Sequence, residues 1–173
     1  MYLAGHTPPE VEVCLVDENT ERIDFSEVPD LVGITTMTAT ASRAYEIARR
    51  YRRQGAKVVL GGIHASMVPE EALRYADAVV AGEAEDIWPQ VIEDFRAGSL
   101  QPLYRQEGRP EFKRPSPPRR DIVDHRRYWS ANGVQTARGC PHGCSFCSVT
   151  AFNGRRLRRR DVDDVLAEVE SLP

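Results

Sequence analysis

The sequence has few cysteines, no long apolar run and no strong excess of either charge, and each lack excludes a class of protein. It holds four cysteines in 173 residues, three of them close together, whereas a small secreted disulfide-bonded domain spreads its cysteines. No stretch approaches the roughly 18 consecutive apolar residues that a transmembrane helix needs. The N-terminus shows no signal peptide. We therefore expect a cytoplasmic protein without a membrane span.

The composition is that of a globular chain. It is 41% hydrophobic and 28% charged, with a formal net charge of −3, and such mild acidity gives no argument for nucleic-acid binding. The length is enough for one ordinary domain and part of another. We expect a small-molecule substrate, which the sequence does not identify.

Strand-like and helix-like segments alternate over the first hundred residues. Apolar and β-branched runs predict strands, and apolar residues at helical spacing predict helices. The expected strands are 11–17, 30–36, 56–60 and 78–81, and the expected helices are 39–54, 69–71 and 84–97, the last kinked at Pro89. This alternation predicts crossover connections and a parallel sheet covered on both faces. Residues 1–98 are thus predicted to form a flavodoxin-like or Rossmann-like α/β domain whose first strand is missing from the chain.

The composition changes after residue 98. Five prolines among many charges over 99–120 indicate an extended linker, in which Leu103-Tyr104 and Glu111-Phe112 fit a short hairpin. A strand at 134–137, a long loop and a helix at 161–172 follow. We predict a first domain over 1–98, a linker over 99–130, and from 131 to 173 only the beginning of a second domain.

Three cysteines, Cys140, Cys144 and Cys147, lie in the long loop, with three and then two residues between them. Thiolates are the usual ligands of iron–sulfur clusters, and close spacing lets one loop wrap a [4Fe–4S] cluster. Three thiolates leave one iron without a protein ligand. An open metal position of this kind binds a substrate or a cofactor.

Two simpler interpretations of these cysteines stay open. A zinc site needs a fourth ligand, for which His142 and Cys14 are the candidates. However, His142 lies inside the first interval, where the spacing is tight for zinc, and Cys14 is more simply a small buried hydrophobe in a predicted strand. The other interpretation is three unrelated buried thiols. Of the five arginines between 155 and 160, most are predicted to be solvated, with one or two able to hold a carboxylate or phosphate.

Three of the predicted strands end in residues suited to ligand contact. A doubly wound sheet binds ligands at the carboxyl ends of its strands, where glycine allows close backbone approach and hydroxyls donate hydrogen bonds. The candidate contacts are Thr35, Thr36, Met37, Thr38, Gly61, Gly62, His64, Gly82 and Glu83. Ordinary turn chemistry explains the same residues, so taken alone they name no ligand.

The segment Arg138-Gly139-Cys140-Pro141-His142-Gly143-Cys144-Ser145-Phe146-Cys147 resembles the cluster loop of radical S-adenosylmethionine (radical SAM) enzymes. The resemblance implies that the open iron binds the amino and carboxylate groups of S-adenosylmethionine. It also implies that an electron from the cluster, supplied by a reductant such as flavodoxin or ferredoxin, cleaves the sulfonium to a 5′-deoxyadenosyl radical. Phe146 fills the family's aromatic position, whose backbone contacts the adenine. In this family the loop follows the first strand of a (β/α) barrel.

The three strand ends, with the segments Val32–Thr38, Val58–Ala72 and Ala76–Glu85, resemble the cobalamin-binding domain that precedes the barrel in B12-dependent radical SAM enzymes. This resemblance covers nearly the whole chain and implies that the nucleotide tail of cobalamin lies at these strand ends. The Asp-x-His-x-x-Gly pattern of cobalt-ligating domains is absent from the sequence. His64 is the candidate for a contact to the corrin, against the simpler role of a hydrogen-bonding loop residue.

The resemblance implies a cobalamin-dependent radical enzyme that methylates, cyclises or rearranges an unactivated carbon. Two alternatives stay open. One is a non-catalytic small-molecule-binding module with a redox or structural metal site, which would not cleave S-adenosylmethionine. The other is a radical enzyme whose first domain has lost cobalamin and serves as a scaffold.

Overall fold

The structure, a computed structural model, describes residues 1–109, 111–112, 116–129 and 132–172. Its elements in chain order are α1 (Tyr2–Gly5), β1 (Leu31–Thr35), the 3-10 helix η1 (Thr38–Thr40), α2 (Ala41–Arg53), β2 (Lys57–Gly61), α3 (Gly62–Met67), α4 (Pro69–Ala72), β3 (Ala78–Ala81), α5 (Trp88–Arg96), β4 (Leu103–Arg105), the 3-10 helix η2 (His125–Arg127), β5 (Ala137–Arg138), α6 (Val149–Asn153), β6 (Arg158–Arg159) and α7 (Val162–Glu170).

The chain forms two compact units. Asp24–Gly108 make one, which we call the sheet unit, and Met1–Ile23 together with Arg109–Pro173 make the other, the cysteine unit. The domain boundaries predicted at 98 and 130 stay a prediction. None of the helices in the described residues has both the length and the apolar character for crossing a membrane.

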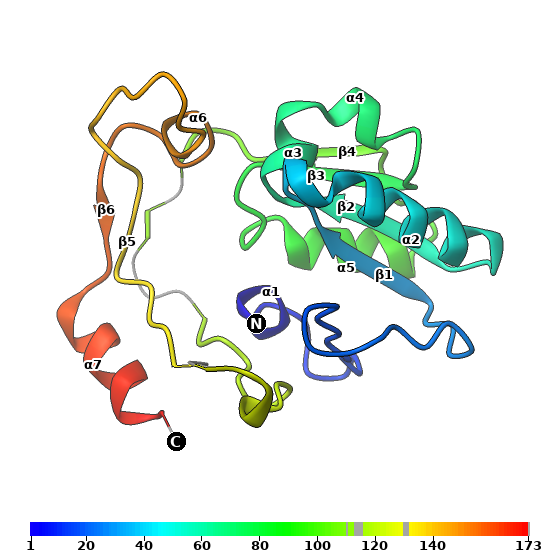
Figure 1. The fold of residues 1–173 in the computed structure, drawn as a ribbon, viewed down its shortest axis with the longest axis horizontal. Helices are drawn as coiled ribbons and strands as arrows, with labels where there is room; N and C mark the ends of the chain where they lie inside the picture. The colour runs from blue at the N-terminus through cyan, green and yellow to red at the C-terminus, as the bar shows by residue number, and fades with distance from the viewer. Residues whose placement is uncertain (110, 113–115, 130–131, 173) are drawn as a thin grey trace. The chain divides into compact units, whose positions relative to one another are not determined.

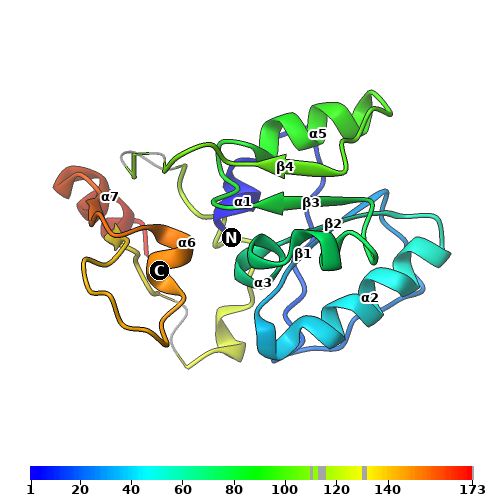
Figure 2. The same cartoon turned by 90° about the horizontal axis from the view of Figure 1, so that it is seen from above.

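The sheet unit is built on four parallel strands in the order β1-β2-β3-β4. Helix α2 covers one face of the sheet and α5 the other, as Figure 2 shows. The buried side chains of the central strands β2 and β3 are apolar: Val58, Leu60 and Val79 are fully buried. Val91 of α5 is fully buried as well. A parallel sheet buried on both faces is thus confirmed.

Helix α2 follows from the spacing seen in the sequence. Its apolar residues Ala44, Ile47, Ala48 and Tyr51 are buried, while the arginines between them are exposed. Gly55, with φ +97°, follows its end, in a conformation that side chains other than glycine rarely adopt. The helix therefore shows one apolar face toward the sheet, as predicted.

Four sequence expectations are wrong. Cys14, expected to be a buried residue of a strand, is exposed. Residues 11–17 form no strand: Leu15 and Val16 are exposed, and without a neighbouring strand an alternating pattern has no ladder to join. The expected hairpin at Leu103-Tyr104 is instead β4, which pairs in parallel with β3. Pro89 causes no kink, because α5 begins at Trp88 and places the proline in its first turn, where no backbone N–H is needed.

The cysteine unit has little regular structure. Strands β5 and β6 form a two-residue antiparallel pair, with Ala137 opposite Arg159, and the cysteine loop and α6 lie between them in the chain (Figure 1). The helix predicted over 161–172 is confirmed as α7. Its apolar residues Val162 and Leu166 are 71% and 52% exposed, so the helix is anchored by other contacts.

Those contacts come from a buried charge cluster. Glu168 of α7, 6% exposed, accepts hydrogen bonds from Arg120 Nη2 at 2.7 Å and from Arg160 Nη1. Arg120 also donates to the carbonyl of Gly133 at 2.8 Å, and Arg160 to that of Gln135 at 3.2 Å. The cluster joins α7 to two other segments of its own unit.

Candidate functional site

The ends of β1 and β2 are joined by the side chain of Thr36. This residue is 1% exposed. Its hydroxyl donates to the carbonyl oxygen of Gly61 at 2.8 Å and accepts from the N–H of Ala65 at 3.2 Å. Thr36, a predicted ligand contact, thus uses its hydroxyl to hold the start of α3 against β1.

A second internal contact joins α3 to the end of β3. Ser66 Oγ donates to the carbonyl of Gly62 at 2.7 Å and accepts from the N–H of Gly82 at 2.9 Å. Gly62 itself has φ +89°, and a Cβ there would lie 2.7 Å from Thr36 O. Gly82 has φ +104°, and a Cβ there would lie 2.9 Å from Gln106 Cβ, so the backbone conformation and the packing favour glycine at both positions. Ser66 was not among the predicted residues, because nothing in the sequence shows that α3 begins at Gly62 and directs this hydroxyl toward β3.

Other predicted contacts at this edge are open to solvent. Thr35, Met37 and Thr38 are exposed, Met37 at 60%. A Cβ at Gly61 would come no nearer than 3.7 Å to any other atom, the carbonyl oxygen of Val80. These exposed hydroxyls, the thioether and the backbone of Gly61 are the parts of this edge that a ligand could reach. Glu83, in contrast, is only 5% exposed.

His64 is held in a network of side chains. Its Nε2 lies 3.1 Å from the hydroxyl of Tyr45 and 3.4 Å from Glu71 Oε1, and its Nδ1 lies 3.3 Å from Thr38 Oγ1. Tyr45 donates to Glu71 Oε1 at 3.0 Å. Burial, and then the contact with Glu71, raise the pKa of Tyr45 to about 12. Both ring nitrogens of His64 have partners within the unit, and its contact to a corrin stays a prediction.

The cysteine loop of the other unit leaves its thiols accessible. Cys140, Cys144 and Cys147 are all free; Cys144 is exposed and the other two are half-buried. The N–H of Cys140 donates to Gly154 O at 3.1 Å, and that of Cys147 to Cys144 O at 3.2 Å. The side chain of Phe146, whose neighbouring backbone is predicted to contact the adenine, is 90% exposed.

Three accessible thiols in one loop are donors that either an iron–sulfur cluster or a zinc ion could use. Within the described residues, no group of three or more Cys, His, Asp or Glu side chains converges on one metal position, as a preformed zinc site requires. A cubane cluster binds each thiolate to a different iron, so its cysteines need not converge on one point. Three thiolates, each able to bind one iron, are chemically compatible with a [4Fe–4S] cluster, and the described residues preform neither kind of metal site.

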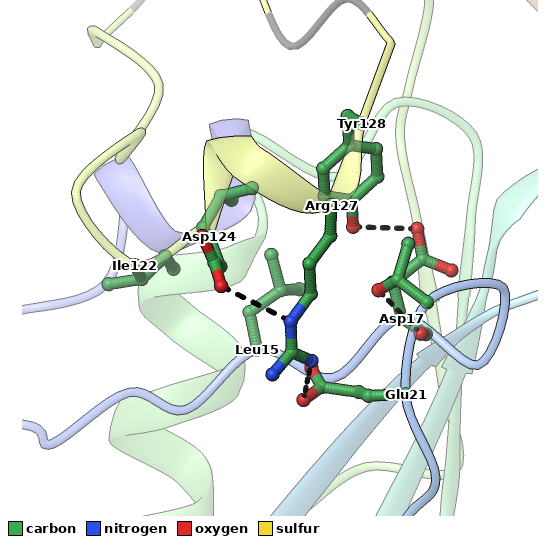
Figure 3. Close-up of a pocket in the computed structure, with 9 residues that line it drawn as sticks. Leu15, Asp17, Glu21, Ile122, Asp124, Arg127 and Tyr128 are labelled. Atoms are coloured by element: carbon green, nitrogen blue, oxygen red, sulfur yellow. Dashed lines mark hydrogen bonds and ion pairs between the residues drawn. The ribbon is translucent and has the colours of Figure 1, made fainter.

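A cavity of about 210 Å³ lies in the cysteine unit, away from every predicted site residue. Figure 3 shows Arg127 between Glu21 and Asp124, at 2.6 and 3.2 Å. Tyr128 donates to Asp17 Oδ2 at 2.9 Å. The hydrogen bonds from Arg126 are the main reason that the pKa of Asp124 falls to about 2. These groups pair with one another and hold residues 15–21 against 122–128.

Comparison with known proteins agrees with the fold. The B12 binding domain family matches residues 4–92. Bacteriochlorophyllide d C-8(2)-methyltransferase of Chlorobaculum tepidum is 37% identical, over 92% of this chain and 37% of that protein. The C-12(1)-methyltransferase of the same organism is 31% identical, over 92% of this chain and 36% of that protein.

A third relative has a different activity. The anaerobic magnesium-protoporphyrin IX monomethyl ester cyclase of Cereibacter sphaeroides is 30% identical, over 83% of this chain and 28% of that protein. The chain thus spans little more than a third of the length of the two methyltransferases, and less of the cyclase.

Proposed function

Because the chain belongs to the B12-binding radical SAM proteins, we propose that it forms the cobalamin- and cluster-binding part of an enzyme that cleaves S-adenosylmethionine reductively. The observation that carries the proposal is the presence, in one chain, of a B12-binding domain and a loop with three free thiols. Methylation of an unactivated carbon is the outcome we favour, since the two relatives of highest identity reported above are methyltransferases. Cyclisation is the second candidate, favoured by the cyclase.

The strand ends of the sheet unit would hold cobalamin. Thr35 and Thr38 would offer hydroxyls, Met37 an apolar surface, and Gly61 a backbone that a ligand can approach closely. Thr36 and Ser66 would act beneath them, because their hydrogen bonds fix the three strand ends relative to one another. When bound, cobalamin supplies the transferable methyl group, and the protein supplies its orientation.

The cysteine loop would hold the cluster. Cys140, Cys144 and Cys147 would each bind one iron, and the backbone beside exposed Phe146 would contact the adenine of S-adenosylmethionine. When bound, the cluster supplies the electron for the cleavage, received from a flavodoxin- or ferredoxin-like reductant. Strand β5 and the helices that follow would be the start of a (β/α) barrel over 131–173. Two relatives are named for bacteriochlorophyllide and one for magnesium-protoporphyrin, so a tetrapyrrole is the first substrate class to test.

Metal analysis tests the proposal directly. Anaerobic reconstitution of the chain is expected to give a brown protein with about four irons and four sulfides per chain. Changing Cys140, Cys144 or Cys147 to Ala should abolish the cluster, while Cys14→Ala should leave it intact. A stable colourless zinc protein would contradict the proposal. Hydroxocobalamin titration then tests the other cofactor, and 5′-deoxyadenosine formation by a protein of the relatives' full length separates an enzyme from a binding module.

A further inference from the structure

The five arginines that follow the cysteines have different environments. Arg158 and Arg160 are buried; Arg158 donates to Asn153 O at 3.1 Å, and Arg160 binds Glu168. These two stabilise their own unit. Arg155, Arg156 and Arg159 are exposed, and among them Arg155 has a distinct position.

The guanidinium of Arg155 lies against the cysteine loop. A Cβ added at Gly143 would come within 3.4 Å of Arg155 Nη2 and 3.9 Å of its Cζ. Gly143 directly precedes Cys144, so the cation lies beside the backbone between two cysteines. A methyl group at residue 143 would touch the guanidinium at ordinary contact distance, so Arg155 packs against the loop backbone at this residue.

No described residue offers Arg155 a hydrogen bond or a carboxylate. Arg138, the arginine just before the loop, is engaged elsewhere: its Nε donates to Gln135 at 3.0 Å and its guanidinium stacks 4.3 Å from the ring centroid of Phe112. Since arginine stays protonated at any ordinary pH, Arg155 places a fixed positive charge beside the loop backbone next to Cys144.

We propose that Arg155 is a positioning residue of the cluster site that acts by charge and makes the cluster easier to reduce. This inference rests on the proposed function. The potential of a cluster depends on net charge, hydrogen bonding and solvent exposure around it. Reduction adds one negative charge, so a neighbouring cation stabilises the reduced form more than the oxidised form. Because Arg155 is exposed, solvent and salt weaken the effect without abolishing it.

The test is a redox titration of the reconstituted chain followed by electron paramagnetic resonance. Arg155→Gln removes the charge and keeps a similar length; we expect the reduced-to-oxidised ratio at a fixed potential to fall about fivefold. At 59 mV per tenfold change for one electron, this is a midpoint lower by about 40 mV. Arg155→Lys should keep the parent value. Arg159→Gln, the matched control, removes the same charge from an exposed position in β6 and should change nothing.

The outcomes separate the two ideas. If the parent takes up no cluster, the proposed function fails and this inference with it. If the parent and Arg155→Gln both take up four irons and share one midpoint, the inference alone is overturned. Cluster loss in Arg155→Gln with retention in Arg155→Lys supports the need for the charge. Loss in both variants would mean that the side chain serves the loop's fold, which also overturns the inference.

Discussion

The two units place candidate cofactor residues on very different supports. In the sheet unit, the strands that end at Thr35 and Gly61 belong to a sheet with a fully buried apolar core that includes Val58 and Leu60. In the cysteine unit, the strands flanking the cysteines are two residues long, and the buried side chains include Glu168 and the arginines around it. The first unit therefore has an extended apolar core, and the second has a cluster of ion pairs among its buried side chains.

This difference bears on how each cofactor would bind. Apolar burial stabilises a fold without any ligand, so we expect the strand ends to have their final arrangement before cobalamin binds. A buried ion pair adds little net stability, because desolvation offsets much of its attraction. We therefore expect the cysteine loop to gain much of its order on binding a cluster, since metal binding and folding are coupled where a site is not preformed.

Removing the central carboxylate should have the largest effect on stability. Glu168→Ala leaves the charge of buried Arg160 without its carboxylate and removes the partner of half-buried Arg120, at a cost of about 3–5 kcal/mol. Hydrogen exchange should show the loss in the cysteine unit alone. Glu170→Ala, an exposed position on the same helix, is the control and should change little. Equal loss of protection in the sheet unit would break the distinction between the two supports.

Gly62→Ala should destabilise the sheet unit by about 2–3 kcal/mol. The residue has φ +89°, and the new Cβ would lie 2.7 Å from a backbone oxygen, which cannot move without disturbing β1. Gly61→Ala is the matched control. Gly61 has φ −143°, and its new Cβ would make only an ordinary contact, 3.7 Å from the carbonyl oxygen of Val80, so the urea midpoint of this variant should stay near the parent value.

The two glycines Gly61 and Gly62 also differ in their value for testing cobalamin binding. A substitution at Gly62 would alter the fold and the groove together, so reduced binding would be ambiguous. Gly61→Val keeps the internal contacts and blocks close approach at the strand end. We expect it to weaken hydroxocobalamin binding in a spectral titration, with the cluster unaffected. Unchanged binding by Gly61→Val would place the ligand elsewhere.

Thr36→Val should cost about 1–3 kcal/mol, because it leaves the carbonyl of Gly61 and the N–H of Ala65 without the hydroxyl that serves both. Thr36→Ser keeps the hydroxyl and should recover most of this stability in urea unfolding. If Val is tolerated as well as Ser, the hydroxyl does not hold the strand ends together.

The sequence predicted the elements that local pattern determines. Strands β1, β2 and β3 are apolar runs, and α2 has a clear helical period, so each was expected within a residue or two of its place. Residues 11–17 have a strand pattern too, but pairing depends on a neighbour that local pattern does not reveal. The direction of β4 is likewise set by the strand beside it.

The candidate site was predictable in part for the same reason. The close spacing of the cysteines and the glycines that follow apolar runs can both be recognised in the sequence. The contact from Arg120 to Glu168 joins residues 48 apart in the chain, and that from Tyr45 to Glu71 joins residues 26 apart. Such pairs become neighbours only through folding, so the sequence did not show that Thr36 and His64 would be engaged inside the unit.

The smallest predicted effect concerns alkaline pH and the sheet unit. Burial raises the pKa of Tyr45 to about 12, from an ordinary value of 10.0. The neutral phenol is thus favoured in the folded state, and its contribution to stability is complete below pH 10. Between pH 10 and about 12 the unfolded chain ionises this tyrosine while the folded one does not, so stability falls as pH rises.

Tyr45→Phe should make that fall less steep, since one of the groups responsible is gone. At neutral pH the variant should lose about 1 kcal/mol with the hydrogen bond to Glu71. Burial also raises the pKa of Tyr104 to about 12, so Tyr104→Phe should remove a second share of the slope, and the double variant should show a shallower slope than either single variant. The measurement is the urea midpoint at several values across this window, with hydrogen exchange to assign the loss to the sheet unit. Because both phenols belong to the unit that apolar burial stabilises, an undiminished slope in the double variant would show that the alkaline weakness arises in the cysteine unit instead.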